Sequence, residues 1–325
     1  MHLFRLLVVL WLGAAGALAA AERRIGVIGL DTFHVIQYLQ AFNDAKAPGH
    51  VPGGRIVAGF VGGSPDVEMS RDRLQVVPRQ ATEKFGITLY DSIEELAARV
   101  DAIMITSIDG RPHLAQFRRT LGSRKPVFID KPFAGSLRDA LEIVRLARET
   151  GTPCFSSSSL RYATNSPALQ AEKLGELRSV YAWGPADIEP HHPDLFWYGI
   201  HAVEALYTVL GRGCTQVVRT TTPSTDVVTG VWHGGRTGTV QGNRGHEKKV
   251  GVMAFGTKAT ITGGDKHSLA TLAARVMEFF QTGTPPVPLE ETLEIFAFME
   301  AADESKRRGG TPVTIAEVLQ LAGRN

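Results

Sequence analysis

The 325-residue sequence predicts an α/β fold: a Rossmann-like, doubly wound parallel sheet, followed by an α+β domain with an open, mostly antiparallel sheet. The first observation is a regular alternation of short apolar runs and helical patterns between residues 24 and 156. The second is a series of strand-like runs between residues 215 and 262 without helical patterns between them. We therefore expect a Rossmann-like domain over residues 22–157 and a second domain over residues 158–325.

The strands of the first domain are short runs rich in β-branched residues, as is typical of buried parallel strands. They are expected at residues 24–30, 55–61, 101–106, 126–129 and 153–156. Helical patterns fill the intervals, with a capping serine at Ser92 and a proline start at Pro112. These helices are expected at residues 34–43, 81–86, 92–98, 112–121 and 136–150. Right-handed crossovers then place helices on both faces of a parallel sheet.

The pattern changes after residue 159. Strand-like runs follow one another here, separated in part by glycine-rich turns, which indicates an antiparallel sheet. They are expected at residues 179–184, 215–220, 227–232, 238–243, 249–255 and 258–262. Amphipathic helices are expected at residues 166–173, 199–210, 269–281 and 290–306.

The composition is that of an ordinary globular protein, with 43% hydrophobic and 21% charged residues. These values exclude a disordered chain, a collagen-like repeat and a disulfide-dense miniprotein. The 35 lysines and arginines nearly balance 33 acidic residues, which leaves a formal charge of +2. Because nucleic-acid-binding and membrane-binding surfaces carry a clear basic excess, we expect neither kind of partner.

The first 21 residues have the pattern of a secretory signal peptide. Arg5 supplies a positive charge, residues 6–19 form a short apolar run, and small residues at 17–21 provide A-x-A cleavage patterns. An uncleaved membrane anchor is the alternative, but the run is shorter than the ~20 residues of a spanning helix. Since the segment has no Arg-Arg pair, we expect export of the unfolded chain to the periplasm or the cell exterior. In that oxidising compartment Cys154 and Cys214 could pair, and two buried thiols are the alternative.

Gly29 ends the first strand, where a dinucleotide fingerprint G-x-G-x-x-G would begin. Asp31 and His34 stand at the positions of the second and third glycines. The second glycine lets the backbone approach a pyrophosphate, so a carboxylate there would repel a diphosphate unless it points away. Alternatively, Asp31 or Thr32 caps the following helix. The topology therefore favours NAD or NADP more strongly than the motif does, and these four residues are candidate cofactor contacts.

The second strand lacks the acid that normally holds the adenosine ribose, since no acid occurs before Asp66. Ser64, with Arg71 or Arg73 nearby, could instead accept a 2′-phosphate, which favours NADP. The alternative is a solvated loop.

Ser107, Asp130 and Lys131 follow later strands of the same predicted sheet and complete the candidate cofactor site. Ligands of open parallel sheets bind at the carboxyl ends of the strands. A lysine there can act as a general acid or base, or hold a substrate hydroxyl. The alternative for Lys131 is a surface lysine paired with Asp130.

His201 lies on the predicted helix 199–210, where it could exchange a proton with the substrate together with Lys131. A structural, hydrogen-bonded histidine is the alternative. Several metal-ligand types precede or include it: Glu189, His191, His192, Asp194 and His201. They lack the close spacing of a metal motif such as H-x-x-x-H, so we expect no metal.

The chain resembles the Gfo/Idh/MocA family, which includes glucose–fructose oxidoreductase and inositol dehydrogenase. The resemblance covers nearly the whole chain after the signal segment. It rests on a series of segments in the same order: RIGVIGL (24–30), DAIMIT (101–106), His113, Asp130-Lys131-Pro132, residues 199–201, residues 286–291 and the alanines 301–302. Asp130-Lys131-Pro132 matches the family's E-K-P segment, and His201 matches the histidine of its D-x-x-x-H segment.

This resemblance implies an N-terminal NAD(P) domain and a C-terminal sheet that carries substrate residues and often the oligomer interface. It implies redox chemistry on a sugar, a polyol or a related hydroxyl or carbonyl compound, with Lys131 and His201 handling the proton, in a homo-oligomer. Trp197 stands where the family motif has aspartate, and Asp194 is close enough in sequence to substitute for it. Because these departures touch cofactor and catalysis, the alternative is a catalytically lapsed or redox-neutral member. Such a member would bind a nucleotide or carbohydrate-like ligand without net hydride transfer.

Overall fold

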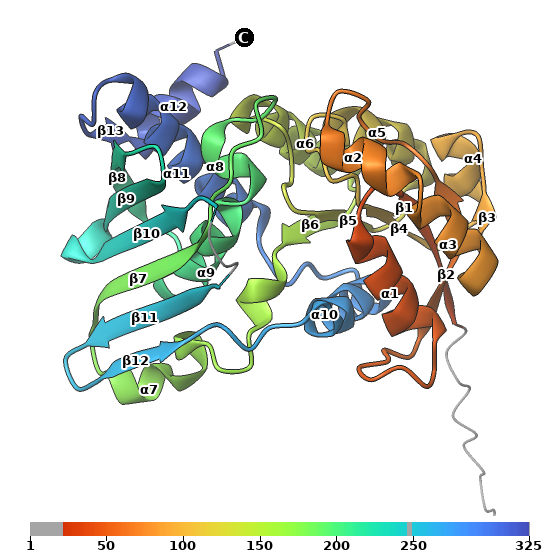
Figure 1. The fold of residues 1–325 in the computed structure, drawn as a ribbon, viewed down its shortest axis with the longest axis horizontal. Helices are drawn as coiled ribbons and strands as arrows, with labels where there is room; N and C mark the ends of the chain where they lie inside the picture. Colours follow the sequence, from red (N-terminus) through yellow and green to blue (C-terminus); the bar gives the residue numbers. More distant parts are fainter. Residues whose placement is uncertain (1–21, 246–248, 325) are drawn as a thin grey trace, which may run out of the picture.

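A computed structural model describes residues 22–245 and 249–324. The expected signal peptide, residues 1–21, lies outside the described part of the chain. Two sheets lie side by side, the first formed by the N-terminal half of the chain and the second by the C-terminal half (Figure 1). The structure confirms the expected fold class.

The first sheet has six parallel strands in the order β3-β2-β1-β4-β5-β6. The strands are β1 (Arg23–Ile28), β2 (Gly54–Phe60), β3 (Thr88–Leu89), β4 (Ala102–Ile105), β5 (Val127–Asp130) and β6 (Cys154–Ser157). The strand order reverses between β1 and β4, so the crevice at the carboxyl ends of these two strands is the topological switch point.

The connecting helices of this sheet are α1 (Phe33–Asn43), α2 (Glu68–Leu74), α3 (Val77–Phe85), α4 (Ile93–Ala98), α5 (His113–Thr120) and α6 (Leu137–Thr150). A 3-10 turn, η1 (Leu121–Ser123), follows α5. The sequence predicted neither α2 nor β3. The polar segment after the Gly62-Gly63-Ser64-Pro65 turn has the composition of a loop, so nothing in its hydropathy indicates a helix.

The second sheet has seven strands in the order β12-β11-β7-β10-β9-β8-β13. They are β7 (Leu177–Pro185), β8 (Cys214–Thr221), β9 (Thr225–Trp232), β10 (Thr237–Asn243), β11 (Gly251–Gly256), β12 (Thr260–Gly263) and β13 (Val313–Thr314). The pair β7 and β10 is parallel and every other pair is antiparallel, so the sheet is mixed, although mostly antiparallel.

The helices after β6 are α7 (Ala171–Leu174), α8 (Asp194–Trp197), α9 (Ile200–Leu210), α10 (Leu269–Thr282), α11 (Leu289–Arg307) and α12 (Ile315–Ala322). Short 3-10 turns complete this part: η2 (Ser159–Tyr162), η3 (Pro167–Gln170) and η4 (His233–Gly235). The helix expected at residues 166–173 is therefore split into η3 and the single turn of α7. The sequence did not predict α12 or β13.

Helix α10 packs on the first half of the molecule, although it comes late in the chain. It lies beside α1 (Figure 1). Its buried residues Val276 and Phe279 share a core with Tyr38 of α1, and the ring centroid of Phe279 is 4.9 Å from that of Phe155. The boundary expected at residues 157 and 158 therefore marks where β6 ends, but packing of the first half also depends on residues 269–282.

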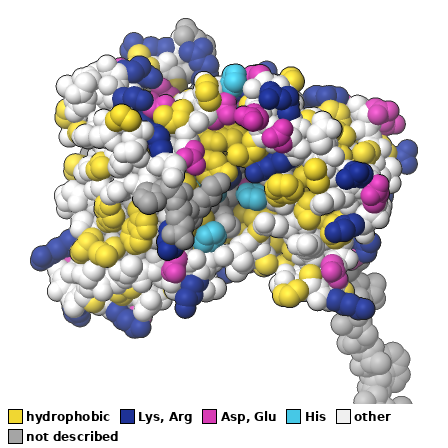
Figure 2. Space-filling view, in the orientation of Figure 1, with side chains coloured by type: hydrophobic (Ala, Val, Ile, Leu, Met, Phe, Trp, Pro, Cys, Tyr) yellow, Lys and Arg dark blue, Asp and Glu magenta, His cyan; other side chains and the backbone are white. Residues whose placement is uncertain are grey.

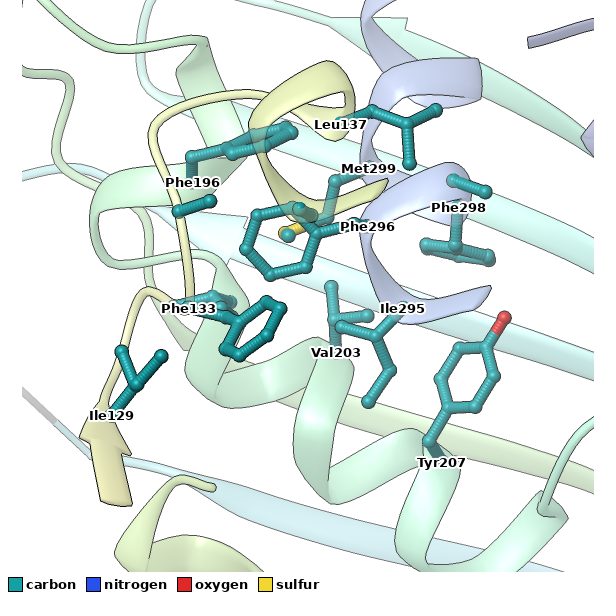
Figure 3. Packing of buried hydrophobic residues seen from close by; sticks show 14 of the residues in the cluster. Ile129, Phe133, Leu137, Phe196, Val203, Tyr207, Ile295, Phe296, Phe298 and Met299 are labelled. Atoms are coloured by element: carbon teal, nitrogen blue, oxygen red, sulfur yellow. The ribbon is translucent and has the colours of Figure 1, made fainter. Parts of the chain in front are cut away.

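The two halves share one hydrophobic core beneath the candidate site (Figure 3). Phe133, Phe196 and Phe296 come from the loop after β5, from α8 and from α11. The ring of Phe296 lies 6.2 Å from Phe133 and 5.0 Å from Phe196, in edge-to-face contacts. This packing fixes the loop that begins with Lys131 and Pro132, whose peptide bond is cis.

Candidate functional site

Lys131 lies at the carboxyl end of β5, between the two sheets. The residue is 9% exposed. Its ammonium lies 5.3 Å from the ring centre of Tyr198 and 6.0 Å from that of Trp197. Its backbone N–H donates to Asp130 Oδ1 at 2.8 Å. The aromatic faces stabilise the ammonium. Lys131 is therefore a buried cation held at the edge of the sheet rather than a surface lysine.

His201 lies in the first turn of α9 and faces the same centre. Its Nδ1 lies 2.7 Å from the hydroxyl of Ser158, which follows β6. Burial, and then the nearby charges of Lys131, His34 and His267, hold the pKa of His201 well below its ordinary value. The structure thus brings Lys131 and His201 together, with a neutral imidazole beside a cation.

His34 crosses from the first turn of α1 to the end of β5. Its Nδ1 lies 2.7 Å from Asp130 Oδ2. Burial alone would raise the pKa of Asp130, but His34 and Lys131 outweigh it and lower that pKa, so the carboxyl is ionised. His34, at the third glycine position, is therefore hydrogen-bonded to the carboxylate next to Lys131.

Thr32 and Asp31 have separate roles in the first turn. The hydroxyl of Thr32 accepts the His34 N–H at 3.3 Å and caps α1. The carboxylate of Asp31 points inward, where it accepts from the Ser70 hydroxyl at 2.7 Å and from the Ile108 N–H at 3.1 Å. Burial raises the pKa of Asp31. Asp31 is not the cap; it joins β1 to the end of β4 and to α2.

Gly29 provides the tight turn that a fingerprint requires. Its φ is +92°, and a Cβ at this position would lie 2.4 Å from the backbone nitrogen of Ser107. The Ser107 hydroxyl accepts from the Gln116 amide at 2.8 Å. Gly29 and Ser107 therefore pack against each other across the switch point.

Ser64 does not meet Arg71 or Arg73 around a common anion site. Its hydroxyl donates to Asp109 Oδ2 at 2.6 Å. Arg71 donates to the carbonyl of Pro65, and the Arg73 guanidinium lies 5.1 Å from the ring centre of Phe33. The 2′-phosphate site expected from the sequence is not assembled in this arrangement.

Residues 64–74, which we call the strap, include α2 and lie over the ends of β1 and β4. Val67 is fully buried against Ile108 and Trp197. Arg111, which follows β4, pairs with Asp66 at 2.8 Å. In Figure 1, α2 lies next to the end of β1. The strap therefore contacts the buried part of the fingerprint turn at Asp31 and reaches across to Trp197 in the second half of the molecule.

Asp194 does not join Lys131 and His201. Its carboxylate binds Arg219 at 2.8 Å and Lys306 at 2.5 Å. Burial would raise the pKa of Asp194, but these two cations lower it. The expectation that Asp194 replaces the missing family aspartate is wrong in geometry, because sequence proximity to Trp197 does not decide the direction of the side chain.

The histidine-rich segment is dispersed rather than gathered. His191 pairs with Glu189 at 2.6 Å, and His192 lies 2.9 Å from Asp109. Within residues 22–245 and 249–324, no three histidine, cysteine or acidic side chains are placed to hold a metal ion. Cys154 and Cys214 are free and buried, and burial raises the pKa of each thiol to about 12.

Two pockets are lined in part by neighbours of Lys131 or His201. One, of about 320 Å³, is lined by Trp197, Tyr198 and residues of the strap, and the other, of about 520 Å³, by Trp183 and His267. Figure 2 shows histidine and apolar side chains around the hollow in the middle of this face.

Sequence reasoning missed Ser158 and Tyr198, which hold His201 and Lys131. A signal for Ser158 was present, because the serine run 156–159 follows a strand at the edge where the other site residues lie. Tyr198 carried no such signal.

The decrease in the free energy of unfolding at acid pH tests whether His201 is neutral in the folded protein. Its folded pKa is depressed, whereas in the unfolded chain it has the ordinary value of about 6.5, so below that pH only the unfolded chain takes up the proton. This contribution to the free energy of unfolding is present above about pH 6.5 and decreases as pH falls. We expect His201→Asn to lose less stability than the wild type between about pH 7.5 and about pH 5.5 in urea titrations. Equal pH slopes for the two proteins would contradict a neutral buried His201.

Comparison with known proteins agrees with this fold. Residues 23–158 match the model of an oxidoreductase family with an NAD-binding Rossmann fold. The comparison with curated proteins gave no match. No helix among the described residues combines the length and apolar character that a membrane crossing requires.

Several solved structures are similar over most of the chain. A myo-inositol 2-dehydrogenase from Lactobacillus plantarum is 15% identical, with a TM-score of 0.74 over 90% of this chain and 99% of that one. An oxidoreductase from Agrobacterium radiobacter, solved with NAD+, L-tartaric acid and magnesium, is 18% identical, with a TM-score of 0.72 over 91% and 99%. A myo-inositol dehydrogenase from Lactobacillus casei, solved with NAD(H) and myo-inositol, is 16% identical, with a TM-score of 0.70 over 90% and 96%. At these identities the likeness shows the shared fold.

Proposed function

We propose that this chain is a Gfo/Idh/MocA oxidoreductase that oxidises or reduces a sugar, a polyol or a related compound with NAD(P), because residues 23–158 match the model of that family's NAD-binding Rossmann fold. The observation that carries the proposal is the neutral His201 next to the buried Lys131 ammonium, at the carboxyl edge of the Rossmann sheet. This edge is where ligands of doubly wound folds bind.

Some features of the site fit a dinucleotide, whereas Asp31 and the strap stand where part of it would bind. Gly29 retains the left-handed turn of the fingerprint, and Lys131 and His201 stand beside the switch point. Asp31, at the second glycine position, is buried and bonded to Ser70 of the strap. When bound, a nicotinamide accepts or supplies the hydride. The chain's own residues then bind the substrate oxygen and transfer the proton.

Lys131 and His201 divide that work by charge. The Lys131 ammonium donates to the substrate oxygen and stabilises the negative charge that develops there. The neutral His201 accepts the hydroxyl proton through Nε2 as the alcohol becomes a carbonyl, and returns it in the reverse direction. Ser158, bonded to Nδ1, keeps the ring in this orientation.

The walls of the pockets support a ring-shaped, hydroxylated substrate. Trp183, Asp265 and His267 line one pocket, and Trp197 and Tyr198 line the other, so aromatic and polar groups are both present. The neighbours that act on or bind myo-inositol have the same fold. A cyclic polyol or a sugar therefore heads the substrate class that we propose.

A redox-neutral or ligand-binding role is the second candidate. It is favoured by Trp197, which replaces a proton-carrying aspartate of the family motif with an indole, and by Asp31 within the fingerprint. In this case the Lys131 and His201 centre would bind a carbohydrate-like ligand without hydride transfer.

Fluorescence titration of NADH and NADPH into protein lacking residues 1–21 separates the two candidates. Saturable binding, followed by reduction of NAD or NADP with a member of a sugar and polyol panel, would support the oxidoreductase and identify the cofactor. If neither NAD nor NADP supports turnover of any compound in the panel by the folded protein, the second candidate replaces the first.

We also propose export and self-association. Export follows from the pattern of residues 1–21, and association from the open second sheet, where Val227, Val231 and Phe255 are exposed. Cell fractionation and light scattering of the mature chain test the two separately.

A further inference from the structure

The strap lies where a dinucleotide would cross the switch point between β1 and β4. We propose that residues 64–74 are a gate, which closes the dinucleotide crevice in the free protein and moves outward when the cofactor enters. This inference rests on the proposed use of NAD(P).

Polar links hold the strap to both edges of the crevice. Ser70 donates to Asp31 at 2.7 Å, which ties α2 to the end of β1. Ser64 donates to Asp109 at 2.6 Å, which ties the start of the strap to the end of β4. The Ser64 N–H donates to the Ser70 hydroxyl at 2.8 Å, so the two links are themselves coupled. Each link uses a group that belongs to the edge where a ligand would bind.

Val67 is the apolar anchor of the strap. It is fully buried against Ile108 from the end of β4 and Trp197 from α8. Met69 and Tyr198 pack on the same cluster from its sides. The strap thus bridges the two halves of the molecule, and the indole at the family's aspartate position is part of its seat.

Two residues of the turn where a pyrophosphate would lie are buried, as a closed gate requires. Asp31 is 0% exposed and Thr32 is 4% exposed. Because Ser70 is bonded to Asp31, the strap cannot leave without breaking this link, while the Ile108 N–H still holds the carboxylate inward. Cofactor entry therefore requires the strap to move away from Asp31.

A closed gate reduces the apparent affinity by the fraction of molecules that are open. Loss of one link worth ~1.4 kcal/mol changes that fraction, and hence the apparent Kd, by about tenfold. We therefore expect Val67→Ala and Ser70→Ala to bind NADH or NADPH about tenfold more tightly than the wild type.

Val77→Ala is the matched control. Val77 is equally buried and lies in the same connection between β2 and β3, but it packs in the core with α1 rather than on the strap's seat. It is expected to lower the melting temperature and to leave the apparent Kd unchanged. The titrations are paired with hydrogen exchange of the amides of residues 68–74, which should lose protection in Val67→Ala and when the wild type binds the nucleotide.

The outcomes separate the gate from the cofactor proposal. Tighter binding in both strap variants but not in Val77→Ala, with faster exchange of residues 68–74, supports the gate. If the wild type and the strap variants bind with equal Kd while residues 68–74 stay protected, the gate is overturned and cofactor use stands. If neither nucleotide binds even to variants whose strap exchanges rapidly, cofactor use fails and the gate fails with it.

Discussion

Replacing Arg219 by methionine is expected to lower the free energy of unfolding by about 3–5 kcal/mol. Arg219 lies on β8 with its side chain fully buried, and it binds three carboxylates, those of Asp194, Asp226 and Asp303. Burial raises the pKa of Asp303 to about 7 even with Arg219 in place. Without the guanidinium, the buried Asp303 loses its cation, while Asp194 keeps Lys306 and Asp226 keeps Arg244. Removing one partner of a buried ion pair is the costly case.

The pH dependence of the Arg219→Met deficit gives a second readout. Carboxyls left without their cation have a raised folded pKa, so their cost is greatest when they are ionised and decreases as they take up protons. The deficit should therefore shrink as pH falls from about 7.5 toward about 5 in urea titrations.

Arg145→Met is the control for the Arg219 measurement. Arg145 lies on the exposed surface of α6, where it pairs with Glu142 and Glu149. Such pairs are screened by solvent, so we expect no measurable change in its unfolding midpoint. If Arg219→Met unfolded like this control, the buried network would make no contribution to stability.

The Arg219 network shows why part of the site could not be predicted from the sequence. Arg219 meets Asp194 across 25 residues and Lys306 meets Asp194 across 112. Sequence spacing places Asp194 near Trp197, but only the fold decides that its carboxylate points to these cations. Long-range ion pairs carry no periodic signal, so an acid close to a motif in sequence is a weak guide to catalysis.

Helices and strands whose apolar residues recur with a clear period were predicted well from the sequence. The alternation of buried strands and amphipathic helices predicted the parallel sheet and the position of Lys131 directly after one of its strands. The strap was missed because Val67 and Met69 are isolated apolar residues in a polar segment. Helix α10 was assigned to the wrong half, because periodicity shows which face of a helix is apolar but not what that face packs on.

Replacing Lys131 by alanine is expected to lower kcat by about 10²–10⁴-fold, measured as NAD(P)H formed with the best substrate of a sugar and polyol panel. The ammonium lies 5.3 Å from the ring centre of Tyr198, and its charge helps to keep the buried Asp130 ionised. It also contributes to the low pKa of His201, so its loss should move the pH dependence of kcat to higher pH. The sign follows because removing a neighbouring positive charge makes the imidazolium easier to form.

Two further variants decide whether the amine itself is required. Lys131→Arg keeps a charge, but its wider, planar guanidinium does not reproduce a compact ammonium, so we expect it to remain strongly impaired. Lys125→Ala removes a lysine whose Nζ donates to the carbonyl of Ala97 in α4, and kcat should not change. Full turnover by Lys131→Ala, with a pH profile like that of the wild type, would move the proton chemistry away from Lys131. Loss of turnover together with the upward shift in pH dependence is the result that only a cation acting beside His201 would produce.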